Sequence, residues 1–160
     1  MGLKSVFGKV YANILVSRLR KTVSEPLHWQ EQTLQNLLKK GASTQFGRDH
    51  NFDSISTYEE FKKQVPVRDY EGLRTYIDKV VAGESGILWP GRPAYFCKTS
   101  GTTSGAKYIP ITPDSVAHHV DAAKLALLCY VNETGKADFI DGKMIFLQGS
   151  PELTDLNGTP

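Results

Sequence analysis

The sequence has few cysteines, and this shortage removes two classes of protein. Only two cysteines occur among 160 residues, Cys97 and Cys129. They lie far apart and each is inside an apolar stretch, so a disulfide framework and a cysteine metal site are disfavoured. We expect two buried, reduced thiols, which favour a cytoplasmic location.

The sequence also lacks an excess of one charge and a long apolar run. Its 19 Lys and Arg nearly balance its 17 Asp and Glu, for a net charge of +2, and no basic stripe interleaved with aromatics occurs. Nucleic acid is therefore not an expected partner. No stretch approaches the roughly 18 apolar residues of a membrane span, so we expect no membrane partner either. Within residues 3–15, apolar residues recur at helical spacing with basic residues between them. This pattern predicts an amphipathic helix that packs on the protein body.

What is present is an ordinary globular composition, with 40% hydrophobic residues and enough length for one domain. A second helix is predicted between Ser24, as its cap, and Gly41. Residues 41–54 are expected to form an ordered loop, with Phe46 and Phe52 as anchors.

Capping signals mark two further helices before the strands begin. A capping box of Ser56 and Glu59 predicts a short helix. Asp69 predicts the start of another, which Gly83 stops, with Leu73, Ile77, Val80 and Val81 facing inward.

The second half of the chain predicts strands and one long helix. Short apolar runs at residues 94–97 and 108–111 are typical of strands. Thr112 and Pro113 predict the start of a helix, which carries Val116, Val120, Ala123, Leu127 and Val131 on one face and ends at Gly135. Residues 143–148 predict a buried strand.

The most informative stretch is Lys-Thr-Ser-Gly-Thr-Thr-Ser-Gly-Ala-Lys, at residues 98–107. Five of its ten residues carry a hydroxyl, two are glycines, and a lysine closes each end. Glycines let main-chain N–H groups face a ligand, hydroxyls donate to phosphate oxygens, and an ammonium neutralises their charge. The stretch predicts a phosphate-binding loop between two strands, with Lys98 directed to solvent. The alternative is that this stretch only connects the two strands and binds no ligand.

The loop does not fit the Walker pattern of nucleotide-binding proteins. In that frame, counted from Gly101, Ala106 replaces the second glycine and Tyr108 replaces the magnesium-binding hydroxyl. Pro110 also lies too close for a helix to begin at the loop. A Walker-type kinase or GTPase is therefore disfavoured.

The loop instead resembles the phosphate-binding motif of the acyl-adenylate-forming superfamily, Thr-Ser-Gly-Thr-Thr-Gly-x-Pro-Lys. Residues 99–103 match it one for one and Lys107 matches its lysine, whereas Ser104 replaces a glycine and Ala106 a proline. Further landmarks narrow the resemblance to the auxin-responsive acyl acid amido synthetase family, in its bacterial branch. They are Phe-Gly-Arg at Phe46–Arg48, Phe61, Val-Pro-Val with Tyr-Glu at Val65–Glu71, Ala82–Glu84 and Ile109–Thr112.

The resemblance implies an α/β fold, the N-terminal part of a luciferase-like adenylate-forming large domain, with helices first and then strands around the loop. Residues 1–160 would belong to one such domain, with a helical lead-in at 1–83, the strand-loop-strand, helix and strand at 84–150, and a truncation at 160. Family members run to several hundred residues, so the chain is expected to be the N-terminal third of an enzyme, with the rest missing, and the fragment to be inactive alone.

The resemblance also implies the chemistry. A small carboxylic acid attacks ATP, and the acyl-adenylate is passed to an amine such as an amino acid, with Mg²⁺ as the second cofactor. Lys107 is the one candidate for a catalytic role. The residues implied to bind the ATP phosphates are Ser100, Gly101, Thr102, Thr103, Ser104, Gly105 and Lys107.

Other readings stay open or are weaker. A coenzyme A ligase of the same superfamily would share the loop but form a thioester. A non-catalytic module would use its amphipathic helices to bind a partner. His118 and His119 are adjacent on a helix and point about 100 degrees apart, so they cannot chelate one metal together. Arg48 is expected to form a structural ion pair.

Overall fold

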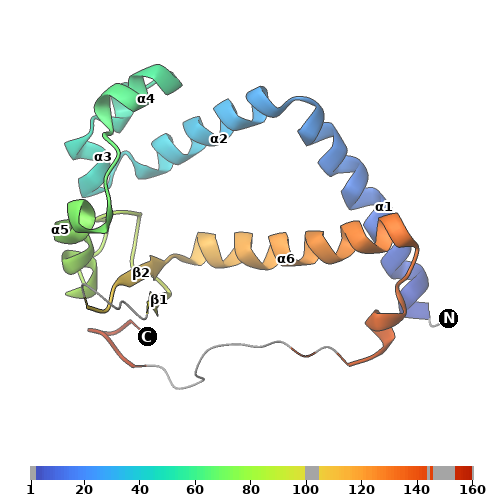
Figure 1. The fold of residues 1–160 in the computed structure, drawn as a ribbon. Coiled ribbons are helices and arrows are strands. Elements are labelled where there is room, and N and C mark those ends of the chain that lie inside the picture. Colours follow the sequence, from blue (N-terminus) through green and yellow to red (C-terminus); the bar gives the residue numbers. More distant parts are fainter. Residues whose placement is uncertain (1–2, 100–104, 144, 146–153, 160) are drawn as a thin grey trace. The chain divides into compact units, whose positions relative to one another are not determined.

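The computed structural model describes residues 3–99, 105–143, 145 and 154–159. A series of helices precedes the two strands, and a long helix follows them, as predicted (Figure 1). The elements are α1 (Leu3–Ser24), α2 (Pro26–Gly41), α3 (Gln45–Asp49), the 3₁₀ helix η1 (Phe52–Ser54), α4 (Tyr58–Gln64), α5 (Tyr70–Val81), β1 (Tyr95–Lys98), β2 (Tyr108–Ile111), α6 (Pro113–Thr134) and the 3₁₀ helix η2 (Asp138–Asp141).

Contacts divide the chain into two compact units. The first unit comprises residues 1–27 and 116–151, and the second comprises residues 28–115 and 152–160. Helix α6 begins in the second unit and continues into the first. That residues 1–160 belong to a single large adenylation domain stays a prediction.

The first unit is centred on a small buried cluster contributed by α1, α6 and the segment after α6. Ala12 and Val131 pack there with Ala137, and all three are buried. The buried hydroxyl of Ser5 lies 3.1 Å from the carbonyl oxygen of Ala137 and 2.8 Å from Oδ2 of Asp141. This hydroxyl therefore ties the start of α1 to η2.

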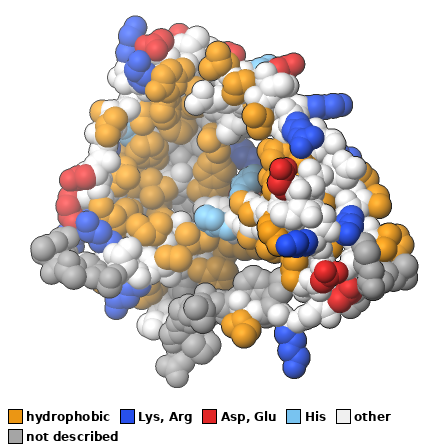
Figure 2. All heavy atoms as spheres, turned by 45° about the vertical axis from the view of Figure 1, so that its right-hand side comes forward, with side chains coloured by type: hydrophobic (Ala, Val, Ile, Leu, Met, Phe, Trp, Pro, Cys, Tyr) orange, Lys and Arg blue, Asp and Glu red, His pale blue; other side chains and the backbone are white. Residues whose placement is uncertain are grey.

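Many large hydrophobic side chains are exposed (Figure 2, orange). On α1, which was predicted to pack on the protein body, Phe7 and Val10 are exposed. On α6, Val120 and Leu127 of the predicted apolar face are exposed. Only Val131 of the predicted α6 face is buried. When two helices pack on each other, each buries only a narrow stripe of its surface. The spacing of apolar residues therefore identified the helices but overestimated how many of those residues are buried. None of the described helices has the length and apolarity needed to cross a bilayer.

Helix α2 ends at Gly41, as predicted, but its start differs from the prediction. Ser24 is the last residue of α1, and its hydroxyl donates to the carbonyl oxygen of Lys21 at 2.7 Å instead of capping α2. Pro26 is the first residue of α2. Proline suits this position because its missing N–H would have no partner within the helix.

The loop predicted after Gly41 is wrong, because much of it is helical. Thr44 caps α3: its hydroxyl accepts from the N–H of Gly47 at 2.9 Å and donates to the carbonyl oxygen of Gly41 at 2.7 Å. A Cβ atom on Gly47 would overlap that same carbonyl group. The glycine of the Phe-Gly-Arg landmark is therefore required by the close approach of two backbone segments.

The predicted aromatic anchors are confirmed. The ring of Phe46 lies edge-on to Phe52 at 5.8 Å and to Tyr76 of α5 at 5.2 Å. The ion pair expected for Arg48 is wrong for the described residues, because its guanidinium donates to the carbonyl oxygen of Ser43. This segment thus packs α3 against α5.

The capping box of α4 lies one residue later than predicted. Thr57, not Ser56, is the cap: its hydroxyl accepts from the N–H of Glu60 at 3.2 Å, and the Glu60 carboxylate accepts from the N–H of Thr57 at 3.0 Å. The N–H of Ser56 also donates to this carboxylate, at 2.7 Å. These main-chain hydrogen bonds, led by that of Ser56, lower the pKa of Glu60.

Helix α5 follows its prediction closely. Asp69 caps it by accepting from the N–H of Gly72 at 2.8 Å. Ile77 and Val80 are buried. Gly83, with φ of +90°, follows the helix and terminates it, because a positive φ is easily adopted only by glycine.

The prediction of two buried thiols is wrong, and the buried strand predicted later in the chain lies mostly outside the described residues. Cys97 is exposed and Cys129 is half-buried, although both thiols were expected inside. Of the strand predicted over residues 143–148, Met144 and residues 146–148 lie outside the described residues. Ile145 is described, and it is exposed and not part of a strand.

We predict that Thr44→Val destabilises the protein by about 1–3 kcal/mol, because the buried N–H of Gly47 loses its acceptor. Valine keeps the branched shape of threonine, so the change isolates the hydroxyl. Urea unfolding followed by circular dichroism measures the effect. The matched control is Thr33→Val, whose exposed hydroxyl donates to Trp29 and whose loss should cost less than about 0.5 kcal/mol. Equal losses for the two variants would contradict the assigned cap.

We predict that Glu60 stabilises α4 in a pH-dependent way. Its folded pKa lies below the unfolded value of about 4.3, so its contribution is complete above about pH 5 and is lost as the pH falls through the folded pKa. Glu60→Ala should therefore lower the free energy of unfolding at pH 7, and its effect should shrink as the pH falls through the folded pKa. Glu59→Ala, on the same helix, should cost less at pH 7, because the Glu59 carboxylate forms an exposed ion pair with Lys62. A constant effect of Glu60→Ala across this range would refute the capping role.

Candidate phosphate-binding site

A two-stranded antiparallel hairpin holds the two ends of the predicted loop. Tyr95 pairs with Ile111 at its far end, and Lys98 pairs with Tyr108 next to the loop. The N–H of Thr99 donates to the carbonyl oxygen of Lys107 at 3.0 Å, which continues the ladder by one pair. The prediction of a strand on each side of the loop is confirmed. The described residues after the loop form β2 and not the helix that a Walker site requires.

The residues predicted to bind phosphate divide into two groups. Ser100, Gly101, Thr102, Thr103 and Ser104 lie outside the described residues. Gly105 and Lys107 are described, and they form the returning end of the loop.

Gly105 has a backbone conformation that selects glycine. Its φ is +82°, and a Cβ atom at this position would have no described residue within 4 Å. The constraint is therefore backbone conformation and not lack of space. Gly105 is exposed.

The two lysines of the loop differ in their surroundings. Lys98 is exposed, in agreement with the prediction that it faces solvent. Lys107 is half-buried, and its Nζ lies 5.2 Å from the centre of the Tyr70 ring. The lysine carried over from the family motif is thus the one that the protein body holds.

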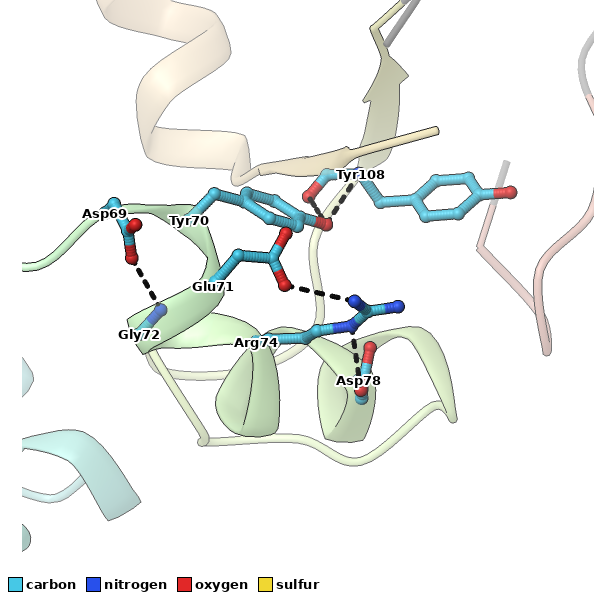
Figure 3. Close-up of polar contacts among 7 residues, drawn as sticks. All are labelled: Asp69, Tyr70, Glu71, Gly72, Arg74, Asp78 and Tyr108. Atoms are coloured by element: carbon cyan, nitrogen blue, oxygen red, sulfur yellow. Dashed lines mark hydrogen bonds and ion pairs between the residues drawn. The ribbon is translucent and has the colours of Figure 1, made fainter. Parts of the chain in front are cut away.

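Tyr70 is a residue of the site that sequence reasoning missed. It is the first residue of α5, and Figure 3 shows its side chain extending to the main chain of Tyr108. Its hydroxyl accepts from the N–H of Tyr108 at 2.9 Å and lies 3.5 Å from the carbonyl oxygen of the same residue. The sequence did mark Tyr70 as part of the Tyr-Glu landmark, directly after the cap Asp69. Its distance in sequence from the loop gave no reason to expect a contact between them.

Arg74, also drawn in Figure 3, is a nearby cation with its own partners. Its Nη1 lies 3.0 Å from a carboxylate oxygen of Glu71, and its Nε lies 3.9 Å from one of Asp78. The hydrogen bond with Glu71, aided by the charges of both carboxylates, raises the pKa of Arg74. Because this guanidinium is engaged along α5, we do not assign it to phosphate.

The remaining sequence candidates do not form a site in the described residues. His118 and His119 are exposed on α6, and no cluster of three or more His, Cys, Asp or Glu able to hold a metal occurs in the described part of the chain. His50 is buried, and its Nδ1 lies 2.8 Å from the carbonyl oxygen of Phe46. An apolar pocket of about 770 Å³ in the first unit is lined by other residues: Val16, Leu19, Arg20, Val23, Ser24, Cys129, Tyr130, Asn132, Glu133 and Thr134.

The comparison with protein families decides the relationship. Residues 15–159 match the family described as GH3 family N-terminal domain. The chain belongs to the GH3 family. This membership confirms the resemblance to acyl acid amido synthetases that was drawn from the loop and its landmarks.

Individual GH3 proteins show the same similarity. The chain is 33% identical over 133 residues to the indole-3-acetic acid-amido synthetase GH3.15 of Arabidopsis thaliana, covering 81% of this chain and 22% of the relative. It is 26% identical over 136 residues to the jasmonoyl-L-amino acid synthetase JAR4 of Nicotiana attenuata, again covering 81% of this chain and 22% of the relative. These two relatives are plant proteins, and the assignment to the bacterial branch stays a prediction.

A solved structure shows the shared fold. The acyl acid amido synthetase AtGH3.15, determined in complex with 2,4-DB, superposes with a TM-score of 0.68 at 25% identity, over 77% of this chain and 22% of that one. The predicted α/β fold of an N-terminal GH3 portion is therefore confirmed. The chain spans about a fifth of the length of the relatives that it matches.

Proposed function

We propose that this chain is the ATP-phosphate-binding N-terminal part of an acyl acid amido synthetase. The complete enzyme activates a small carboxylic acid as an acyl-adenylate and passes the acyl group to an amine such as an amino acid. The observation that carries the proposal is the hairpin that presents a Thr/Ser/Gly loop and Lys107 in a GH3 chain. The named activities of the relatives support an amine acceptor over the thiol of coenzyme A.

The loop's task follows from the charges in the reaction. A carboxylate oxygen attacks the α-phosphorus of ATP, the bond from that phosphorus to the bridging oxygen breaks, and pyrophosphate leaves with the bonding electrons. Negative charge thus shifts onto the β- and γ-phosphates, which must be held in line with the attack. We assign this holding to the main-chain N–H of Gly105 and the ammonium of Lys107, together with the loop residues Ser100, Gly101, Thr102, Thr103 and Ser104.

The described donors fit a phosphate group. Gly105 is exposed, and Lys107 supplies a positive charge at the same end of the loop. Mg²⁺ usually binds through substrate phosphates with one or two protein carboxylates, so in this proposal it is bound with the nucleotide. It would neutralise charge on the departing pyrophosphate.

The proposal assigns the other substrates to the rest of the enzyme. Because the chain spans about a fifth of its relatives, we assign the acid pocket and the amine site to residues beyond this portion. Free thiols and the use of ATP are consistent with the cytoplasmic location that the sequence predicts.

The first test uses trypsin, because the loop is flanked by its cleavage sites Lys98 and Lys107. We predict that ATP with Mg²⁺ slows cleavage at these two sites, as the bound phosphates order the loop, while cleavage at Lys136 is unchanged. Mass spectrometry of a time course identifies each cut. If ATP leaves the rate of cleavage unchanged at each of the three sites, the loop only connects the strands and does not bind phosphate.

A second test measures catalysis, as the release of pyrophosphate from ATP. The 160-residue chain alone should release none above background. The same chain joined to the remaining four-fifths of AtGH3.15, in place of the matching residues, should release pyrophosphate when a carboxylic acid is added. If the joined protein folds and binds ATP but releases no pyrophosphate with a panel of acids, the proposed reaction is wrong.

We predict that Gly105→Ala weakens ATP binding by about tenfold or more, because alanine resists a φ of +82° and the loop's returning end must shift. Isothermal titration calorimetry measures the affinity. The matched control is Gly86→Ala, which has φ of +68° and equally open surroundings but lies outside the loop. Both variants should lose similar stability, and only Gly105→Ala should lose affinity.

A further inference from the structure

The contact between Tyr70 and Tyr108 joins two residues 38 positions apart in the sequence. A phenol hydroxyl is both a donor and an acceptor, so a single group can serve both the N–H and the C=O of one residue. Its 2.9 Å distance from the N–H of Tyr108 is a normal hydrogen bond, and its 3.5 Å distance from the carbonyl oxygen is long. Tyr70 is half-buried, which keeps solvent from competing fully for these bonds.

The ladder explains why the main chain of Tyr108 is available. In an antiparallel pair, successive residues of a strand direct their backbone groups alternately toward the partner strand and away from it. The carbonyl of Lys107 faces β1, since it accepts from Thr99. The backbone groups of Tyr108 therefore face away from β1, at an edge that would otherwise be unpaired, and Tyr70 occupies that edge.

The ring of Tyr70 performs a second task. The ammonium of Lys107 lies 5.2 Å from the ring centre, within the range of a cation–π contact. Such a contact holds the cation through its charge and does not require one of its three N–H donors. The ammonium can therefore stay beside the loop with its donors directed to an anion.

We propose that Tyr70 is the positioning residue for Lys107: its hydroxyl fixes the main chain of the next residue, and its ring holds the ammonium at the returning end of the loop. The inference rests on the proposed function, since the anion is the phosphate of ATP. Tyr70 acts through Lys107 and is not itself assigned a contact with the nucleotide. Removing the hydroxyl and removing the ring should thus have separable effects.

Helix α5 offers a matched control in Tyr76. Its hydroxyl donates to Oδ2 of Asp49 at 2.8 Å, and its ring packs on Phe46. Burial, followed by the hydrogen bond to Asp49, raises the pKa of Tyr76. Tyr76→Phe therefore removes a bonded phenol hydroxyl from the same helix without altering a contact to the loop.

The test is a double-mutant cycle on ATP affinity, measured by calorimetry with Mg²⁺ present. We expect Tyr70→Phe to weaken ATP binding by about three- to tenfold and Tyr70→Leu by about ten- to thirtyfold. In a Lys107→Ala background both Tyr70 changes should weaken binding by a smaller factor, because the ring no longer has an ammonium to hold. Tyr76→Phe should lower the melting temperature and leave the affinity unchanged. If Tyr70→Leu costs the same factor with and without Lys107, its role is structural and the proposal is wrong.

A second measurement does not depend on ATP. Reductive methylation with ¹³C-formaldehyde keeps the charge of a lysine and gives it an NMR signal, which Lys107→Arg assigns. We expect the Lys107 signal to be shifted upfield by the ring of Tyr70, to stay shifted in Tyr70→Phe, and to move to the position of the exposed Lys98 in Tyr70→Leu. An unshifted Lys107 signal in the parent protein overturns the inference. A shifted signal without ATP binding upholds the contact and counts against the proposed function alone.

Discussion

The hydrogen bonds of the Tyr70 hydroxyl to the main chain of Tyr108 are the contact on which the candidate site depends. A two-stranded hairpin is marginally stable by itself, and in the described residues the sheet consists of β1 and β2 only. The loop that they carry is rich in groups that do not pack. Its geometry must therefore be set from outside the hairpin, and the start of α5 provides that support.

Helix α5 is itself fixed at several points of the second unit. Buried Ile77 and Val80 hold its apolar face, and the side-chain amide of Asn157 donates to the carbonyl oxygen of Val81 at 2.8 Å. Toward α3, Lys79 donates to Oε1 of Gln45 at 2.9 Å. The helices before the strands are thus more than a lead-in, because they determine where the support of the loop lies.

Local signals predicted much of this arrangement, and their failures have physical reasons. Asp69 was correctly identified as a cap, whereas Ser24 was not, because a serine hydroxyl can also donate to a carbonyl of the preceding turn. Helix α3, which Thr44 caps and which contains Gly47, was missed because these residue types are equally common in loops. The prediction of buried thiols failed because apolar neighbours in the sequence do not ensure that another part of the chain packs over a residue, as exposed Cys97 shows.

The sequence by itself determined that helices come before the hairpin, the limits of α5 and α6, and the hydroxyl-rich stretch between two strands. Caps, terminating glycines and turn residues act within a few positions of the chain, so they can be read in one dimension. Only the tertiary structure decided that Tyr70 supports Lys107, and that Gly47 must be glycine because the backbone of Gly41 lies against it. These contacts depend on how separate segments pack, and no local spacing encodes that packing.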